Sequence, residues 1–270
     1  MTAARIALAV LGALGLAGCK STGPDASVEA NHLVANDSWC PEGFEQSTPD
    51  TCFLLPEGNP KDASILVYLH GMYKDRGATN EWNVVRTASK RGFAVVIPRG
   101  KRGQCPWRAE LKDFFCWPQD AEDAPTMKST VAEWDKVLWQ VDALLEKGTH
   151  RRYVLAFSNG GFFADYLATQ GLFQAQAYAI VNGGPLAPPS SKAKAVPMLL
   201  VAAEDDKEEG ASGKMKELHE SLVKSGWSHA YCPRAGGHAL VADDVDGALR
   251  FFKRDADGAL KAANGALPCK

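Results

Sequence analysis

Arg152-Tyr-Val-Leu-Ala-Phe-Ser158-Asn159-Gly160-Gly161 is the stretch that decides the fold. Its apolar first half is typical of a buried strand, and the glycines after Ser158 allow a sharp turn into a helix. A serine at such a turn lies at the carboxyl end of a strand and the N-terminus of a helix. It is either an exposed nucleophile or a simple helix cap. The stretch therefore predicts a strand–serine–helix unit, with Ser158 as a candidate nucleophile.

Similar apolar runs recur on both sides of this stretch. They cover residues 64–69, 92–98, 177–181, 197–203 and 228–232. Segments with a helical pattern separate them, over 81–91, 130–147, 161–170, 213–225 and 243–253. Apolar strands that alternate with helices predict an α/β fold with a mostly parallel sheet and helices on both faces. Residues 40–55 contain no helix and predict an N-terminal antiparallel hairpin at the sheet edge.

Two further groups follow predicted strands at their carboxyl ends. Glu204-Asp205-Asp206 comes directly after the run that ends at Ala203, and His238 follows the run over 228–232. In parallel sheets, functional residues collect on the loops at this edge. A nucleophilic serine needs a base, and the base needs an orienting acid. A serine, an acid and a histidine at three strand ends supply all three groups.

The segment Ala156-Phe-Ser158-Asn-Gly160 resembles the nucleophile elbow, G-x-S-x-G, of the α/β-hydrolase superfamily, with alanine in place of the first glycine. The chain order of serine, acid and histidine is also that of the family. The resemblance covers residues 39–270. It implies an α/β-hydrolase fold, with Ser158 as nucleophile and His238 as general base. In finer detail the chain resembles small secreted esterases of the feruloyl-esterase and polyhydroxyalkanoate-depolymerase types.

The resemblance also bears on which carboxylate orients the histidine. In this family the acid usually lies three residues beyond a small residue that ends the strand. Counting from Ala203 gives Asp206, and counting from Ala202 gives Asp205. Because Ala203 is the last apolar residue, Asp206 is favoured, and the other aspartate is expected to cap the next helix.

The family further implies two backbone N–H donors for an oxyanion. One belongs to Asn159, the residue after the nucleophile. The other lies in His70-Gly71-Met72, which resembles the HG motif of the family, and we assign it to Met72. His70 is then structural.

Residues 101–128 form a long segment with no helical pattern that is rich in aromatic side chains, among them Trp107 and Trp117. Segments of this length in a compact domain are often functional lids. The aromatics either line an acyl or aromatic pocket or fill a local core next to a disulfide.

The start of the chain predicts export. Residues 6–16 are an apolar run too short to span a bilayer, and Leu16-Ala17-Gly18-Cys19 resembles the lipobox of bacterial lipoproteins. We therefore expect a lipoprotein signal peptide at 1–18, lipidation of Cys19, a flexible tether over 19–38 and a hydrolase domain over 39–270. Lys20 favours the outer membrane if the host is Gram-negative. An ordinary cleaved signal peptide is the alternative.

Six of the seven cysteines remain after Cys19. An even number behind an export signal indicates disulfides, although sequence leaves their connectivity open. Proximity favours Cys40–Cys52 and Cys105–Cys116, which leaves Cys232 with Cys269. Zinc is disfavoured because no two of these cysteines have the spacing of a zinc motif.

The composition narrows the function. A net charge of −2 offers no basic surface for nucleic acid. We expect a serine hydrolase that cleaves a small or polymeric carboxylic ester through an acyl-enzyme, with no metal or organic cofactor. An amidase or peptidase with the same triad is the alternative, and a non-catalytic surface-binding lipoprotein is the rival from another class. The sequence leaves the substrate and the oligomeric state open.

Overall fold

The computed structural model describes residues 38–74, 79–105, 108–146, 150–207, 211–257 and 269, all within one compact unit, Ser38–Lys270. The expected signal peptide, Cys19 and the tether up to residue 37 lie outside the described residues, as does Trp107. Among the described residues, no helix has the length and apolar character needed to cross a bilayer.

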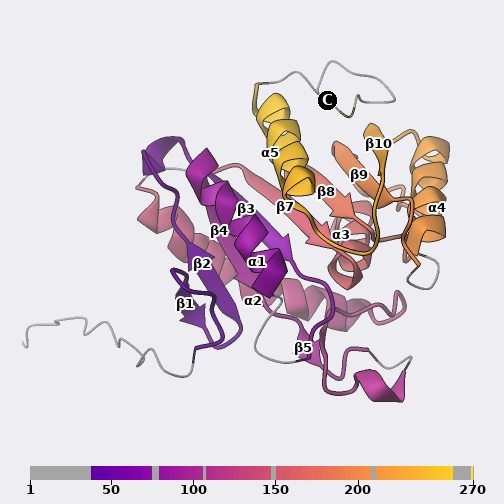
Figure 1. Cartoon of the computed structure of the whole chain (residues 1–270), viewed down its shortest axis with the longest axis horizontal. Coiled ribbons are helices and arrows are strands. Elements are labelled where there is room, and N and C mark those ends of the chain that lie inside the picture. Colours follow the sequence, from indigo (N-terminus) through magenta and orange to yellow (C-terminus); the bar gives the residue numbers. More distant parts are fainter. Residues whose placement is uncertain are drawn as a thin grey trace, which may run out of the picture. The chain divides into compact units, whose positions relative to one another are not determined.

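One eight-stranded sheet forms the centre of this unit, in the order β1-β2-β4-β3-β7-β8-β9-β10 (Figure 1). The strands are β1 Glu45–Thr48, β2 Thr51–Leu54, β3 Ser64–Leu69, β4 Phe93–Pro98, β7 Arg152–Phe157, β8 Ala177–Val181, β9 Met198–Ala203 and β10 His229–Arg234. From β4 to β10 all neighbours are parallel, whereas β1 and β2 pair antiparallel at the edge. The predicted mostly parallel sheet with an N-terminal hairpin is therefore confirmed.

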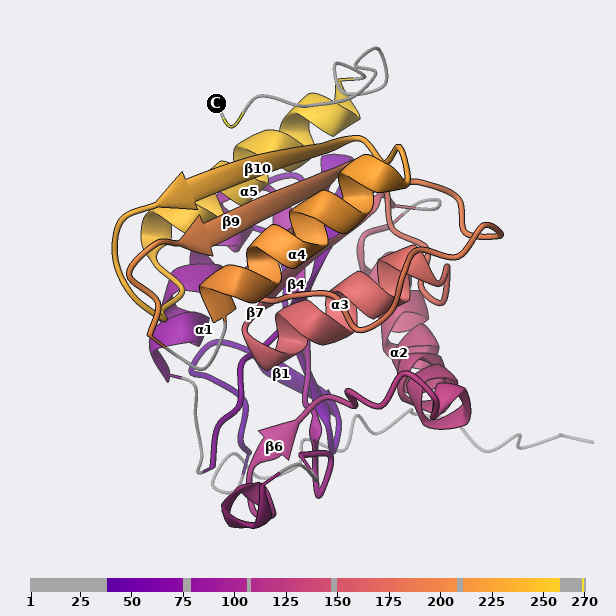
Figure 2. The same cartoon turned by 90° about the vertical axis from the view of Figure 1, so that its right-hand side faces the viewer.

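Helices cover both faces of the sheet (Figure 2). The helices are α1 Thr79–Val85, α2 Ala124–Leu144, α3 Asn159–Thr169, α4 Ala211–Lys224 and α5 Ala242–Ala256. Alternate residues of each strand enter different cores: Val154 belongs to a core that includes residues of α2, α3 and α4, whereas Leu155 belongs to one that includes residues of α1 and α5. This two-sided burial explains why the strands are apolar throughout.

Two helices differ most from their predicted bounds. The helix expected over 81–91 is α1 followed by a 3-10 helix, Arg86–Arg91, which ends at Gly92 with a φ of 82°. Helix α2 begins at Ala124 instead of residue 130. The Asp123 side chain caps it by accepting a hydrogen bond from the Thr126 N–H at 3.1 Å, and Pro125 lies in its first turn. A cap and a proline, not apolar periodicity, set this boundary.

The segment after β4 contains more structure than its sequence suggests. Strands β5 (Lys101–Arg102) and β6 (Phe115–Cys116) form an antiparallel hairpin. The Cys105–Cys116 disulfide closes it, and Cys40–Cys52 and Cys232–Cys269 also form disulfides among the described residues. Trp117, directly after the hairpin, is fully buried in the core. Trp117 therefore packs in the main core, which it shares with residues of α2 and α3, and not in a separate local core beside the disulfide.

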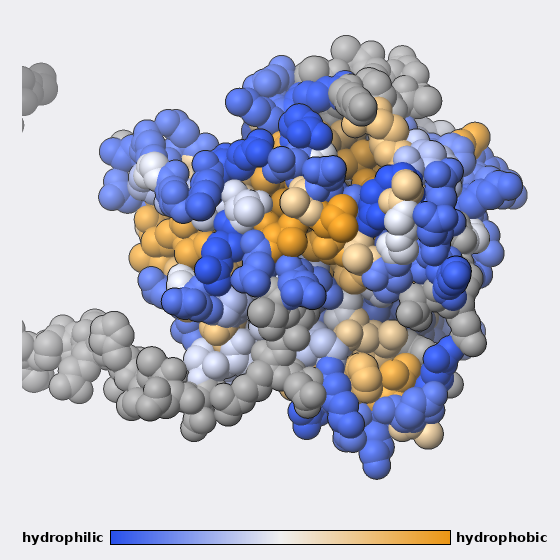
Figure 3. Space-filling model, viewed as in Figure 1, coloured by the Kyte–Doolittle hydropathy of each residue, from blue (hydrophilic) through white to orange (hydrophobic). Residues whose placement is uncertain are grey.

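The outer surface is mainly polar on the side seen in Figure 3. Hydrophilic residues cover most of that face, and hydrophobic residues show in smaller patches between them. The apolar residues of the strands lie inside instead, as Ile65, Val67 and Leu69 do with no exposed surface.

Candidate active site

Ser158 occupies a strained turn between β7 and α3. Its φ of 53° and ψ of −124° are rare for a residue with a side chain. The Ser158 N–H continues the β7–β8 ladder by donating to the Val181 C=O at 3.0 Å. A Cβ at Gly160 would come within 2.3 Å of the Leu69 carbonyl oxygen, so only glycine fits there. The sheet and the close helix together hold this turn, as the elbow motif predicts.

The structure brings Ser158, His238 and Asp206 into one hydrogen-bonded chain. Ser158 Oγ lies 2.7 Å from His238 Nε2, and His238 Nδ1 lies 2.7 Å from Asp206 Oδ2. The carboxylate of Asp206 has no exposed surface, whereas the imidazole of His238 is 23% exposed. A carboxylate can only accept, so Nδ1 carries the proton and Nε2 is free to accept from the serine hydroxyl.

Asp205 has a different part in this loop cluster. Its Oδ2 accepts a hydrogen bond from the Gly236 N–H at 2.9 Å, and its own N–H donates to the Gly236 C=O at 3.1 Å. The expectation that Asp205 caps the next helix is wrong, because α4 begins only at Ala211. Asp205 instead ties the loop after β9 to the loop that carries His238.

The other side of the His238 loop is braced by an ion pair. The Arg234 guanidinium contacts both carboxylate oxygens of Asp244, at 2.7 and 2.9 Å, and its Nη2 also donates to the Ala239 C=O at 2.6 Å. The Asp244 side chain is 2% exposed, so this bidentate pair is shielded from water. His238 is therefore carried by a loop fixed at both ends.

Met72 and Asn159, the two residues expected to supply oxyanion donors, follow β3 and Ser158, respectively. Neither backbone N–H is used in any hydrogen bond among the residues that the structure describes. Asn159 is the first residue of α3, where an N–H lacks a partner within the helix. Both groups are thus available to a ligand, as an oxyanion hole requires.

His70 holds residues 70–73, the loop after β3 that carries Met72 and is called the oxyanion loop below, and its imidazole ring is uncharged. Its Nδ1–H donates to the Gly71 C=O at 2.6 Å, and its Nε2 accepts from the Gly100 N–H at 2.9 Å. Burial lowers the pKa of His70 to about 4, against the hydrogen bond to Gly71, which raises it. The neutral ring joins the end of β3 to the chain after β4, consistent with the structural role expected for it.

This buried histidine makes the fold sensitive to acid. The unfolded chain, with a His pKa of about 6.5, binds a proton that folded His70 binds only near pH 4. Stability is therefore lost as the pH falls from about 6.5 to 4, by about 3 kcal/mol in total. Glutamine cannot titrate, so in His70→Gln the free energy of unfolding is expected to depend less on pH between about 6.5 and 4. Urea unfolding at several pH values measures it, and equal slopes in both proteins would contradict the assignment.

Glu81, on α1, belongs to the site but was not predicted. Its Oε2 accepts hydrogen bonds from the Tyr68 hydroxyl and, at 3.1 Å, from the Gly71 N–H. Burial raises the pKa of its carboxyl, while these hydrogen bonds and the nearby His238 lower it. Glu81 thus fixes the residue that precedes Met72. No motif could have indicated this, because the contacts depend on how α1 packs against β3.

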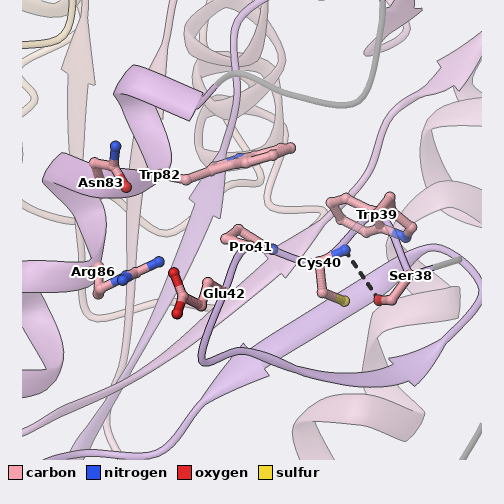
Figure 4. Close-up of a pocket in the computed structure, with 8 residues that line it drawn as sticks. All are labelled: Ser38, Trp39, Cys40, Pro41, Glu42, Trp82, Asn83 and Arg86. Atoms are coloured by element: carbon pink, nitrogen blue, oxygen red, sulfur yellow. Dashed lines mark hydrogen bonds between the residues drawn. The ribbon is translucent and has the colours of Figure 1, made fainter. Parts of the chain in front are cut away.

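A separate cavity of about 420 Å³ lies between residues 38–42 and the region of α1 (Figure 4). The rings of Trp39 and Trp82 line it with centroids 5.9 Å apart, and the charged ends of Glu42 and Arg86 point toward each other. None of its lining residues belongs to the chain of Ser158, His238 and Asp206 or supplies an oxyanion donor.

No protein-family model matches the sequence. No curated protein matches it either. Solved structures do match. TT1662 from Thermus thermophilus gives a TM-score of 0.58 at 16% identity, over 82% of this chain and 98% of that one. Esterase PE8 gives a TM-score of 0.56 at 19% identity, over 75% of this chain and 96% of that one. The Bacillus cereus carboxylesterase gives a TM-score of 0.54 at 16% identity, over 76% of this chain and 93% of that one.

These likenesses, together with the strand order, establish the fold. The chain has the α/β-hydrolase fold. At the carboxyl edge of the sheet, the chain carries a serine, a histidine and an aspartate in hydrogen-bond contact.

Proposed function

We propose that this protein is a serine hydrolase that cleaves carboxylic esters through an acyl-enzyme. The observation that carries the proposal is the unbroken chain from Ser158 Oγ through His238 to Asp206, with both contacts at 2.7 Å. The strained elbow at Ser158 supports it, as do the N–H groups of Met72 and Asn159, which have no hydrogen-bond partner among the residues that the structure describes. A fold alone does not define an activity, and the residues of this site are what indicate the reaction.

Each group has a defined part in the proposed reaction. His238 Nε2 takes the proton of Ser158 as Oγ bonds to the ester carbonyl carbon, and the N–H groups of Met72 and Asn159 stabilise the resulting oxyanion. When the tetrahedral intermediate collapses, the C–O bond to the alcohol breaks and His238 returns the proton to the alcohol. Water then attacks the acyl-enzyme by the same steps and frees the acid. Asp206 keeps the imidazole oriented and stabilises its charge.

Esters are favoured over amides because their leaving group departs more readily from an unspecialised triad. The purified full chain should hydrolyse p-nitrophenyl acetate and butyrate, and matched anilides much more slowly. Efficient anilide cleavage would favour an amidase or peptidase. No turnover of either class by folded protein would favour the non-catalytic binding lipoprotein. Methyl ferulate and short hydroxyalkanoate oligomers test the finer resemblance to feruloyl esterases and depolymerases.

We further propose that a lipid on Cys19 anchors the enzyme to a bacterial membrane, the outer one in a Gram-negative host. The lipobox-like Leu16-Ala17-Gly18-Cys19 supports this. Cys19→Ser should release active enzyme into the soluble fraction, because Ser158, His238 and Asp206 all lie in the compact unit Ser38–Lys270. Fractionation followed by esterase assay measures the shift. If the variant stays in washed membranes as the unchanged chain does, the anchor is not a lipid on Cys19.

A further inference from the structure

The hairpin closed by Cys105–Cys116 leads into a segment that holds the oxyanion loop from two sides. Phe115 and Tyr73 form a β-bridge, in which the Phe115 N–H donates to the Tyr73 C=O at 2.8 Å. The indole Nε1–H of Trp117 donates to the His70 C=O at 2.9 Å. Met72, whose N–H has no hydrogen-bond partner in the described part of the chain, lies between these two residues in the sequence.

The same segment also holds the second oxyanion donor. The side-chain Oδ1 of Asn159 accepts a hydrogen bond from the Trp117 backbone N–H at 2.7 Å, and its Nδ2 donates to the Trp117 C=O at 3.4 Å. Asn159 is only 2% exposed, so water cannot easily replace these bonds. One residue, Trp117, is therefore bonded to both stretches of chain that carry a donor.

Trp117 itself is fixed firmly in the core. Its ring has no exposed surface, stacks on Phe163 with centroids 5.4 Å apart and planes 7° apart, and meets the edge of Trp134 at 5.7 Å. A large aromatic side chain packed in this way moves little, so the groups hydrogen-bonded to Trp117 are held in fixed positions.

The disulfide also contacts the oxyanion loop directly, through Met72. Cys105 Sγ lies 3.5 Å from Met72 Sδ, and both cysteines are buried. Closing the hairpin with a covalent bond therefore holds Cys105 against the Met72 side chain.

We propose that Trp117 and the side chain of Asn159 are positioning residues that preorganise the oxyanion hole, with the Cys105–Cys116 hairpin as their support. The segment over residues 101–128 then supports catalysis by holding both donors in place. We call the contacts of Trp117 with His70 and Asn159 the clamp. This inference rests on the proposed function, because an oxyanion hole is useful only if a tetrahedral intermediate forms. Donors aimed at the oxyanion act in the transition state, so loosening the clamp should lower kcat and leave KM nearly unchanged.

Asn159→Ala tests the clamp, because it keeps the backbone donor and removes only the bonds to Trp117. We expect kcat for p-nitrophenyl acetate to fall about 10²-fold with KM within about twofold, the effect of a donor displaced by about 1 Å. Tyr166→Phe is the matched control. Tyr166 is on the same helix, and its hydroxyl donates to the Ala121 C=O of the same segment at 2.9 Å. Its kcat should stay within about twofold of the unchanged chain.

The disulfide is tested in the same way. Replacing Cys105 and Cys116 together by alanine should lower kcat about tenfold, with KM again nearly unchanged. Replacing Cys40 and Cys52 together removes a bridge of similar sequence separation, 12 against 11 residues, from the sheet edge. It should lower the melting temperature without changing kcat.

Amide hydrogen exchange of residues 69–74 gives a readout independent of turnover. We expect exchange there to speed up at least about tenfold in Asn159→Ala and in the Cys105, Cys116 variant, and not in the controls. Unchanged exchange, a kcat within about threefold for Asn159→Ala, or equal kcat losses in variant and control would each overturn the clamp. If the unchanged chain hydrolyses no ester, the proposed function fails, and the exchange experiment alone decides whether this segment positions the loop.

Discussion

Ser158→Ala should lower ester turnover by about 10⁶-fold while the protein still folds, because the change removes the nucleophile and nothing else in the site replaces it. The hydroxyl contacts His238 Nε2 at 2.7 Å, and the backbone of the turn is held by the Val181 C=O and by Gly160, not by the side chain. Alanine has the same Cβ as serine and is no more strained at a φ of 53°.

Turnover of p-nitrophenyl acetate and urea unfolding, measured on the same preparation, test this prediction. Ser129→Ala is a suitable control, since Ser129 is an exposed residue of α2 whose hydroxyl bonds only within its helix, to the Thr126 C=O. A Ser158→Ala protein with turnover within tenfold of the unchanged chain would exclude Ser158 as the nucleophile.

The second large effect is expected at Asp206. Asp206→Asn should lower turnover by about 10⁴-fold, because an amide N–H facing Nδ1 favours the imidazole tautomer with its proton on Nε2, which cannot accept from serine. Asp205→Asn should change turnover little, since an amide oxygen still accepts from the exposed Gly236 N–H. The pair is well matched, as the same substitution is made at adjacent positions.

The alternatives give different results in the same assay. A large loss only in Asp205→Asn would reverse the assignment of the acid. Mild losses in both variants would indicate that another carboxylate orients His238. Glu81 is then the first candidate, because it interacts electrostatically with His238. Unfolding curves for both variants show whether a loss of turnover reflects a loss of fold.

Much of the fold could be predicted from the sequence. The strands agree with their predicted bounds to within two residues, because each is a continuous apolar run buried on both faces, as Ala177–Val181 is. That Ser158, an acid after β9 and His238 lie together follows from the strands, since residues after parallel strands meet at one edge of the sheet, whereas the choice of Asp206 over Asp205 came from the family resemblance. The start of α2 was missed because Asp123 and Pro125, not buried residues, define it.

The supports of the site could not be predicted, for a physical reason. Trp117 and Asn159 are 42 residues apart, and their hydrogen bonds depend on how a hairpin without a periodic pattern packs on α3. Glu81 contacts Gly71 only because α1 returns to the end of β3. Contacts of this kind come from tertiary packing, which leaves no regular spacing in the sequence.

Labelling of the folded chain with a fluorophosphonate tests the central claim most directly. The reagent phosphonylates a serine that a histidine has activated, with loss of fluoride, and the modified residue can be located by mass spectrometry of peptides. We predict one modified residue, Ser158, with labelling abolished by unfolding and greatly slowed in His238→Ala. A folded chain that does not react, or that reacts at another serine, would contradict the proposed mechanism.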